Sequence, residues 1–158
     1  MKKLILLVLL LLTMNSYAQD AWYVVKDVHP DISCRYTFWK SAYDMGLKDV
    51  KVMVRKMPNR MLSEGVNNHD AVQQVNDKLY IVYLTSNKEV ANNLREIADH
   101  VNTHIKQMAE GRLIPLENGK FIFDGVVYDK PENRKEHRGL PFEKEAFNSF
   151  KRFNHGKN

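Results

Sequence analysis

The chain has 158 residues, of which 44% are hydrophobic and 27% charged, and it contains only 7 glycines and 5 prolines. This composition excludes disordered, collagen-like and low-complexity chains, and the length suits one ordinary folded domain. The formal net charge is +5 at pH 7. Cys34 is the single cysteine, which excludes an internal disulfide and any zinc site built from several thiolates.

The first eighteen residues have the layout of a secretory signal. Lys2 and Lys3 precede an unbroken apolar run over 4–12, and the small residues Ser16 and Ala18 stand three positions and one position before a cleavage point after Ala18. The apolar run is too short for a membrane span, which takes about 20 apolar residues. The segment therefore predicts export rather than anchoring.

Export sets the expected location of the mature chain. Gln19 follows the cleavage point, and in this respect the segment resembles signals of Gram-negative bacteria, so we expect a periplasmic or secreted bacterial protein.

The excess of basic groups lies near the C-terminus. Residues 20–129 hold 14 basic and 15 acidic groups, whereas residues 130–158 hold 8 basic and 4 acidic groups. We expect this basic C-terminal tail to be solvated, partly disordered and able to touch an anionic surface. No nucleic-acid partner is expected of an exported protein.

The spacing of apolar residues predicts the elements of the first half of the chain, namely a strand over 22–25, a helix over 33–45 and strands over 50–54, 69–75 and 78–85. Ser33 is the expected N-cap of the helix, and Gly46 is its expected C-terminal stop. Residues 56–68 have the composition of a loop. Asn76 and Asp77 are the expected two-residue turn of a hairpin.

The second half is expected to hold the longest helix, over 88–109, followed by a small meander. One face of this helix is apolar and should pack on the sheet, while charged and amide residues line the opposite face. Aromatic residues such as Phe142 and Phe147 predict a terminal helix within the tail that docks on the domain. The order of elements predicts a single α+β domain over 19–129, with a mainly antiparallel sheet packed against a long helix.

Cys34 is the first candidate for chemistry because it lies at the start of a predicted helix. Helix N-terminal N–H groups favour the thiolate form of a cysteine, which is the nucleophilic form. A nucleophile needs a general base, and His69, at the head of a predicted strand, is the candidate. Taken singly, Cys34 has the simpler interpretation of a small buried hydrophobic residue.

The order of these residues resembles the transglutaminase-like and related papain-clan cysteine hydrolases. Cys34 opens a helix, Gly46 follows twelve residues later, and His69 begins a strand, so that the resemblance covers residues 33–87. It implies that Cys34 attacks an acyl carbon and that His69 accepts the proton. It further implies a peptide or protein substrate, cell-wall peptides included, and no cofactor.

A third residue of the triad is expected to orient the imidazole. A hairpin loop at 76–77 places Leu84 opposite His69, where the family would have an acidic residue. Ser86 and Asn87 are the nearest polar residues, and Asn87 is the candidate because an amide fills this role in papain-like enzymes.

Two functions of different classes follow. The first is a cysteine hydrolase or acyltransferase that uses Cys34, His69 and Asn87 on peptide or amide bonds. The second is a noncatalytic periplasmic or secreted binding or accessory protein. An accessible thiol facing an imidazole favours the first, and a thiol enclosed by the core favours the second.

His100 and His104 form an i,i+4 pair on the long helix, a spacing that lets two imidazoles share one metal ion. A zinc protease of this pattern would have Glu directly after the first histidine, but Val101 stands there as part of the apolar stripe. Packing of His104 at the edge of the buried face is therefore the expected role. No metal site is assigned from the sequence, with zinc binding kept as the alternative for this pair.

Overall fold

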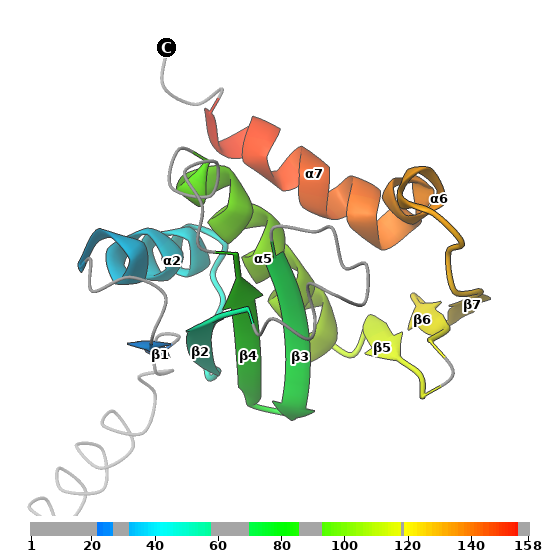
Figure 1. Cartoon of the computed structure of the whole chain (residues 1–158), viewed down its shortest axis with the longest axis horizontal. Helices are drawn as coiled ribbons and strands as arrows, with labels where there is room; N and C mark the ends of the chain where they lie inside the picture. Colours follow the sequence, from blue (N-terminus) through cyan, green and yellow to red (C-terminus); the bar gives the residue numbers. More distant parts are fainter. Residues whose placement is uncertain (1–21, 27–31, 58–69, 86–92, 118, 155–158) are drawn as a thin grey trace, which may run out of the picture.

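A computed structural model describes residues 22–26, 32–57, 70–85, 93–117 and 119–154 (Figure 1). The strands are β1 (Trp22–Lys26), β2 (Lys51–Lys56), β3 (Asp70–Asn76), β4 (Leu79–Leu84), β5 (Leu113–Pro115), β6 (Phe121–Phe123) and β7 (Val126–Tyr128). The helices are α2 (Ile32–Asp44), α5 (Leu94–Ala109), α6 (Arg134–Gly139) and α7 (Pro141–Asn154). The predicted signal segment lies outside the described residues.

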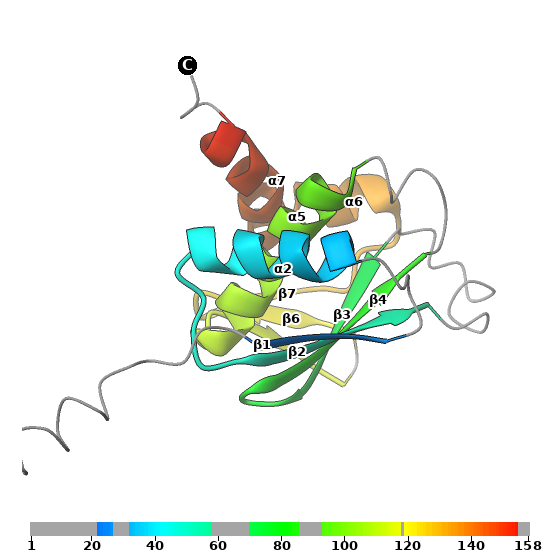
Figure 2. The ribbon, with the colours of Figure 1, turned by 90° about the vertical axis from the view of Figure 1, so that its left-hand side faces the viewer.

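The larger sheet has the strand order β1-β2-β4-β3. Strand β2 runs parallel to both β1 and β4, and β3 closes the sheet as the antiparallel partner of β4. Alternate residues of β2 and β4 are buried, among them Val52, Val54 and Val82. Figure 2 shows α2 and α5 on the same side of this sheet, which is where the alternating residues find apolar cover.

Helix α5 is the central helix of the molecule. Val101 and Ile105 are fully buried in the main core, together with Phe38 of α2. The amide of Asn102 is also fully buried and donates from Nδ2 to the backbone carbonyl of Phe38 at 3.0 Å. A buried amide is tolerated only when it is hydrogen-bonded, so this contact fixes how α5 lies against α2.

Helix α7 packs on α5, and α6 packs on α7. Phe142 is buried at the start of α7, and its ring lies 5.2 Å from that of Phe121 and 5.9 Å from that of Phe123, measured between centroids. Arg112, just after α5, donates to Asp124 in the β6–β7 turn and to Glu145 on α7. The small antiparallel sheet β5-β6-β7 and α7 are thereby tied to the end of α5.

The α+β class, a helix packed on the sheet and the single small domain are confirmed, but this helix has 16 residues and is shorter than the expected helix over 88–109. The sheet that packs against α5 is not mainly antiparallel, because β2 is parallel to both of its neighbours, β1 and β4. Antiparallel pairing is found in the β3–β4 hairpin and in the small sheet β5-β6-β7. Docking of the terminal helix is also confirmed, so a solvated, disordered tail was the wrong expectation for residues 134–154. Within the described part of the chain, no helix has both the length and the apolar character needed to cross a membrane.

Two helix starts differ from the sequence-based expectation. Helix α2 begins at Ile32, so Ser33 lies inside its first turn and is not the N-cap. Helix α5 begins at Leu94 with Asn93 as its N-cap, six residues later than expected. Both errors are of the same kind, because apolar periodicity locates a helical face better than it locates the residue at which the helix begins.

A small ion-pair network joins the end of α2 to the start of α5. Arg95 donates to Asp44 Oδ2 and to Asp99 Oδ2, at 3.0 Å in each case, and Lys40 also contacts the Asp44 carboxylate. Burial of Asp44 by itself would raise the pKa of its carboxyl group, but the hydrogen bonds from Lys40 and Arg95 lower that pKa below its ordinary value. The network therefore stabilises the folded chain when Asp44 is ionised.

We predict that Asp44→Asn lowers the free energy of unfolding by about 1 kcal/mol at pH 7. Because the folded-state pKa lies below the unfolded value, the contribution of Asp44 is complete above about pH 4 and is lost as the pH falls through the folded pKa. Denaturant unfolding at pH 7 and near pH 2 measures the difference. Asp49→Asn is the control, since Asp49 is exposed and its φ of 57° suits asparagine. An equal penalty for Asp44→Asn at both pH values contradicts the prediction.

Candidate functional site

Cys34 is the third residue of α2 and is only 4% exposed. It belongs to the same buried apolar cluster as Phe38 and Val52. The interpretation of Cys34 as a small buried hydrophobic residue is thus confirmed. Its proposed partners, His69 and Asn87, lie outside the described residues, so the Cys34–His69 contact stays a prediction.

The register of the β3–β4 hairpin differs from the expected one by a residue. Asn76 Oδ1 accepts from the backbone N–H of Lys78, so Asn76 opens the turn and pairs with Leu79. An irregularity between Gln74 and Asn76 then shifts the ladder, and Leu84 pairs with Asp70 rather than with His69. The choice of Asn87 as third residue, and of Ser86 as its alternative, started from the wrong register; both residues lie outside the described part of the chain.

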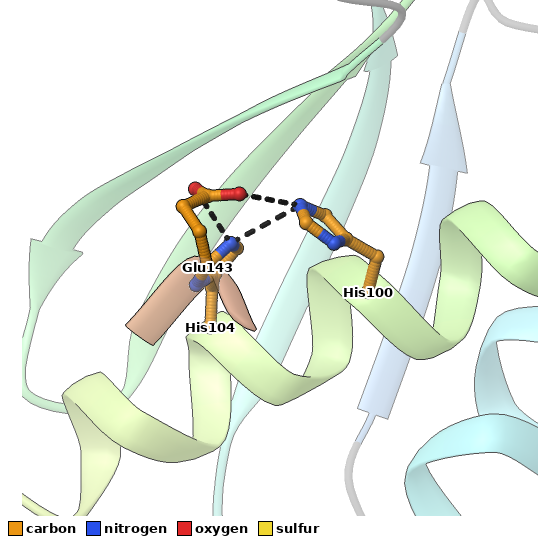
Figure 3. Close-up of side chains that lie close together, drawn as sticks. All are labelled: His100, His104 and Glu143. Carbon is orange, nitrogen blue, oxygen red and sulfur yellow. Dashed lines mark hydrogen bonds and ion pairs between the residues drawn. The ribbon is translucent and has the colours of Figure 1, made fainter. Parts of the chain in front are cut away.

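The structure brings three potential metal ligands together at the α5–α7 contact. His100 and His104 stand one turn apart on α5, and Glu143 comes from the first turn of α7 (Figure 3). Their ligand atoms all lie within 4.8 Å of one another. The His104 Nε2 atom is 3.2 Å from His100 Nε2 and 3.2 Å from Glu143 Oε1, and His100 Nε2 is 3.5 Å from Glu143 Oε2.

These spacings can be compared with the edges of a coordination tetrahedron. Zinc lies about 2.0–2.2 Å from imidazole nitrogen and carboxylate oxygen, so two ligands at a tetrahedral angle are about 3.3 Å apart. The three measured distances fall on either side of that value. Glu143 contacts His104 through Oε1 and His100 through Oε2, so these distances end on different carboxylate oxygens. With one ligand atom from each residue, the set lies within 4.8 Å, and binding of one ion would draw these atoms closer together.

The site is largely shielded from water, since the side chains of His100, His104 and Glu143 are 15%, 10% and 6% exposed. Burial, and then the neighbouring His104, lower the pKa of His100 to about 4. Burial alone would raise the pKa of Glu143, but the contact with His104 and the nearby imidazoles lower it below its ordinary value. A neutral His100 imidazole thus faces an ionised Glu143 carboxylate near pH 7.

A second layer of hydrogen bonds orients His104. Gln107 Nε2 donates to the backbone carbonyl of Phe142 at 3.1 Å, which directs Gln107 Oε1 toward His104 Nδ1 at 2.9 Å. His104 must therefore carry a proton on Nδ1, and its Nε2 faces Glu143 and His100. Metal-binding histidines are held in this way, with the far ring nitrogen donating to a carbonyl or carboxylate.

His100 is held mainly by packing. Its ring lies 4.7 Å from the ring of Phe147 on α7 and 4.6 Å from that of His104, measured between centroids. Among the described residues, its buried Nδ1 has no hydrogen-bond partner, so its polar contacts run through Nε2. The His100 ring thus directs Nε2 toward His104 and Glu143.

Glu143 is the site residue that sequence analysis missed. It is 39 positions beyond His104 and lies in the segment interpreted as a basic tail. The prediction that Phe142 docks on the domain was the available signal, because the acidic residue beside a docking aromatic is carried into the same contact. The placement of His104 at the edge of the buried face is confirmed.

No family model, curated protein or solved structure matches this chain. The resemblance to cysteine hydrolases therefore rests on the order of sequence features alone.

We predict that Cys34 reacts with iodoacetamide at pH 7 at least about 10-fold more slowly in the folded protein than in the unfolded chain, because reaction requires local opening of α2. Mass spectrometry of timed samples, with the same protein in guanidinium chloride as the control, gives both rates. A folded-state rate equal to or above the unfolded rate would contradict the prediction and point to an accessible thiolate.

Proposed function

We propose that this chain is a noncatalytic, exported accessory protein that binds a divalent transition-metal ion, zinc foremost, through His100, His104 and Glu143. The observation that carries the proposal is the convergence of these three side chains, whose ligand atoms lie within 4.8 Å of one another. Export is inferred from the signal-like segment 1–18, with a periplasmic or secreted location as the expected outcome.

The ligand types narrow the choice of metal. Two imidazoles and one carboxylate suit zinc and its first-row neighbours, and this ligand set is known from zinc enzymes. Calcium and magnesium prefer all-oxygen sites and are disfavoured here. The chain has one cysteine, Cys34, and that residue is buried in the core, so thiolate coordination plays no part in this site.

A hydrolytic role for the metal is disfavoured by the residue that follows His100. Zinc peptidases with an i,i+4 histidine pair use a glutamate at that position as the general base. Here the position is Val101, which is fully buried and packs in the core on a different face of α5. The metal would thus be held without the base that activates water in such enzymes.

The enclosed position of Cys34 also favours the accessory protein over the cysteine hydrolase. A thiol nucleophile must reach an acyl carbon, and a side chain with 4% exposure inside an apolar cluster does not present its sulfur to a substrate.

We predict that zinc at about 100 times its Kd stabilises the folded protein by about 2.7 kcal/mol, since it binds the folded state preferentially. For a chain of this size the melting temperature should rise by about 5–10 °C. Differential scanning fluorimetry with zinc and with a chelator measures the shift. Glu143→Gln and His104→Ala should each remove most of it.

Glu96→Gln is the matched control, because Glu96 is an exposed acidic residue in the first turn of the same helix α5 and should leave the zinc shift unchanged. The proposal is overturned when zinc leaves the wild-type melting temperature unaltered. It is equally overturned when Glu143→Gln and His104→Ala, shown to be folded by circular dichroism, keep the full shift.

A further inference from the structure

Building on the proposed metal-binding function, we propose that His137 on α6 is a fourth protein ligand that closes the coordination sphere of the ion. The side chain lies beside the three-ligand cluster, with His137 Nε2 3.4 Å from Glu143 Oε1. Glu143 is thus contacted by imidazoles on both carboxylate oxygens, with His104 and His137 at Oε1 and His100 at Oε2.

The local fold of α6 positions His137 beside Glu143. Asn133 caps the helix by accepting from the backbone N–H groups of Lys135 and Glu136, both at 3.0 Å. The Glu136 carboxylate in turn accepts from Asn133 Nδ2 at 2.7 Å and from the backbone N–H of Glu132 at 2.9 Å. This reciprocal capping holds the short helix together at its start.

The end of α6 is equally well defined. Leu140 donates its N–H to the carbonyl of His137 at 3.1 Å and then adopts an extended conformation with ψ of 144°, after which α7 begins at Pro141. The chain therefore turns between His137 and Glu143, and both side chains reach the same point from two helices. Phe142, directly before Glu143, is buried, and the centroid of its ring lies 6.3 Å from that of the His137 ring.

His137 is the most exposed of the four side chains at the site. Its side chain is 30% exposed, which is more than that of His100, His104 or Glu143, so it lies on the side of the cluster nearer to solvent. A zinc ion held by three protein groups keeps one position for water, whereas a structural site fills all four with protein ligands. His137 is the described side chain that contacts Glu143 and can fill that position.

Binding of His137 to the ion requires its side chain to move. The group of ligand atoms within 4.8 Å of one another comprises His100, His104 and Glu143, so the His137 imidazole must turn from the carboxylate toward the ion. Its distance from Glu143 Oε1, 3.4 Å, is close to the spacing of about 3.3 Å between two ligands of one zinc ion. The completed site would hold α5, α6 and α7 on a single ion and exclude water from it.

The test is to count bound imidazoles in the cobalt(II)-loaded full-length chain by proton NMR, since each ligating imidazole gives a strongly shifted N–H resonance. We expect three such resonances in the wild type and two in His137→Ala. Competition with a chromophoric chelator should show that His137→Ala weakens cobalt and zinc binding by about 100-fold or more, because loss of a ligand exceeds the loss of an outer-shell partner.

His137→Gln serves as a second variant that keeps a hydrogen-bonding side chain beside Glu143 and should lose the same resonance. Lys135→Ala is the control, because Lys135 is exposed on α6 and its side chain has no part in the cap; it should keep three resonances. Circular dichroism without metal establishes that each variant is folded.

The outcomes separate the two proposals. Two shifted resonances in the wild type, with unchanged affinity in both His137 variants, overturn the role of His137 and leave the three-ligand site standing. No shifted resonance and no binding in the wild type overturn the metal-binding function itself.

Discussion

The burial of the Glu143 carboxylate between α5 and α7 is the constraint on which the rest of the site depends. An ionised carboxylate that is 6% exposed is costly unless charged or hydrogen-bonding groups compensate it. The compensation here comes from imidazoles, His100 and His104 on α5 and His137 on α6. Docking of the C-terminal helices and assembly of the site are therefore the same event, because α7 cannot pack on α5 without bringing this carboxylate to the histidines.

The apolar skeleton of the fold was predictable because it depends on local periodicity. The alternation through Val52 and Val54 identified β2, and the stripe through Val101 and Ile105 identified α5. The polar face of α5 was misjudged for a physical reason. Amide residues opposite an apolar stripe usually meet water, but Asn102 is buried and bonds to a backbone carbonyl of α2. The local sequence of α5 does not record that α2, from an earlier part of the chain, covers this residue.

The candidate site was predictable only in part. The i,i+4 spacing of His100 and His104 is a local pattern, and it singled out the pair without its third ligand. Glu143 reaches them through tertiary packing of a segment whose excess of basic residues suggested a solvated tail. Cys34 is the converse case, because its place in the first turn of a helix is a local pattern, whereas its enclosure by the core depends on tertiary packing. Its contact with His69 stays a prediction.

X-ray absorption spectroscopy of the zinc-loaded wild-type protein tests the central claim most directly, because it reports the atoms bound to the ion. The account predicts imidazole nitrogen and carboxylate oxygen in a four-coordinate shell at about 2.0–2.2 Å, with the outer-shell scattering of histidine rings. A six-coordinate shell of oxygen alone, or the absence of histidine scattering, would contradict it.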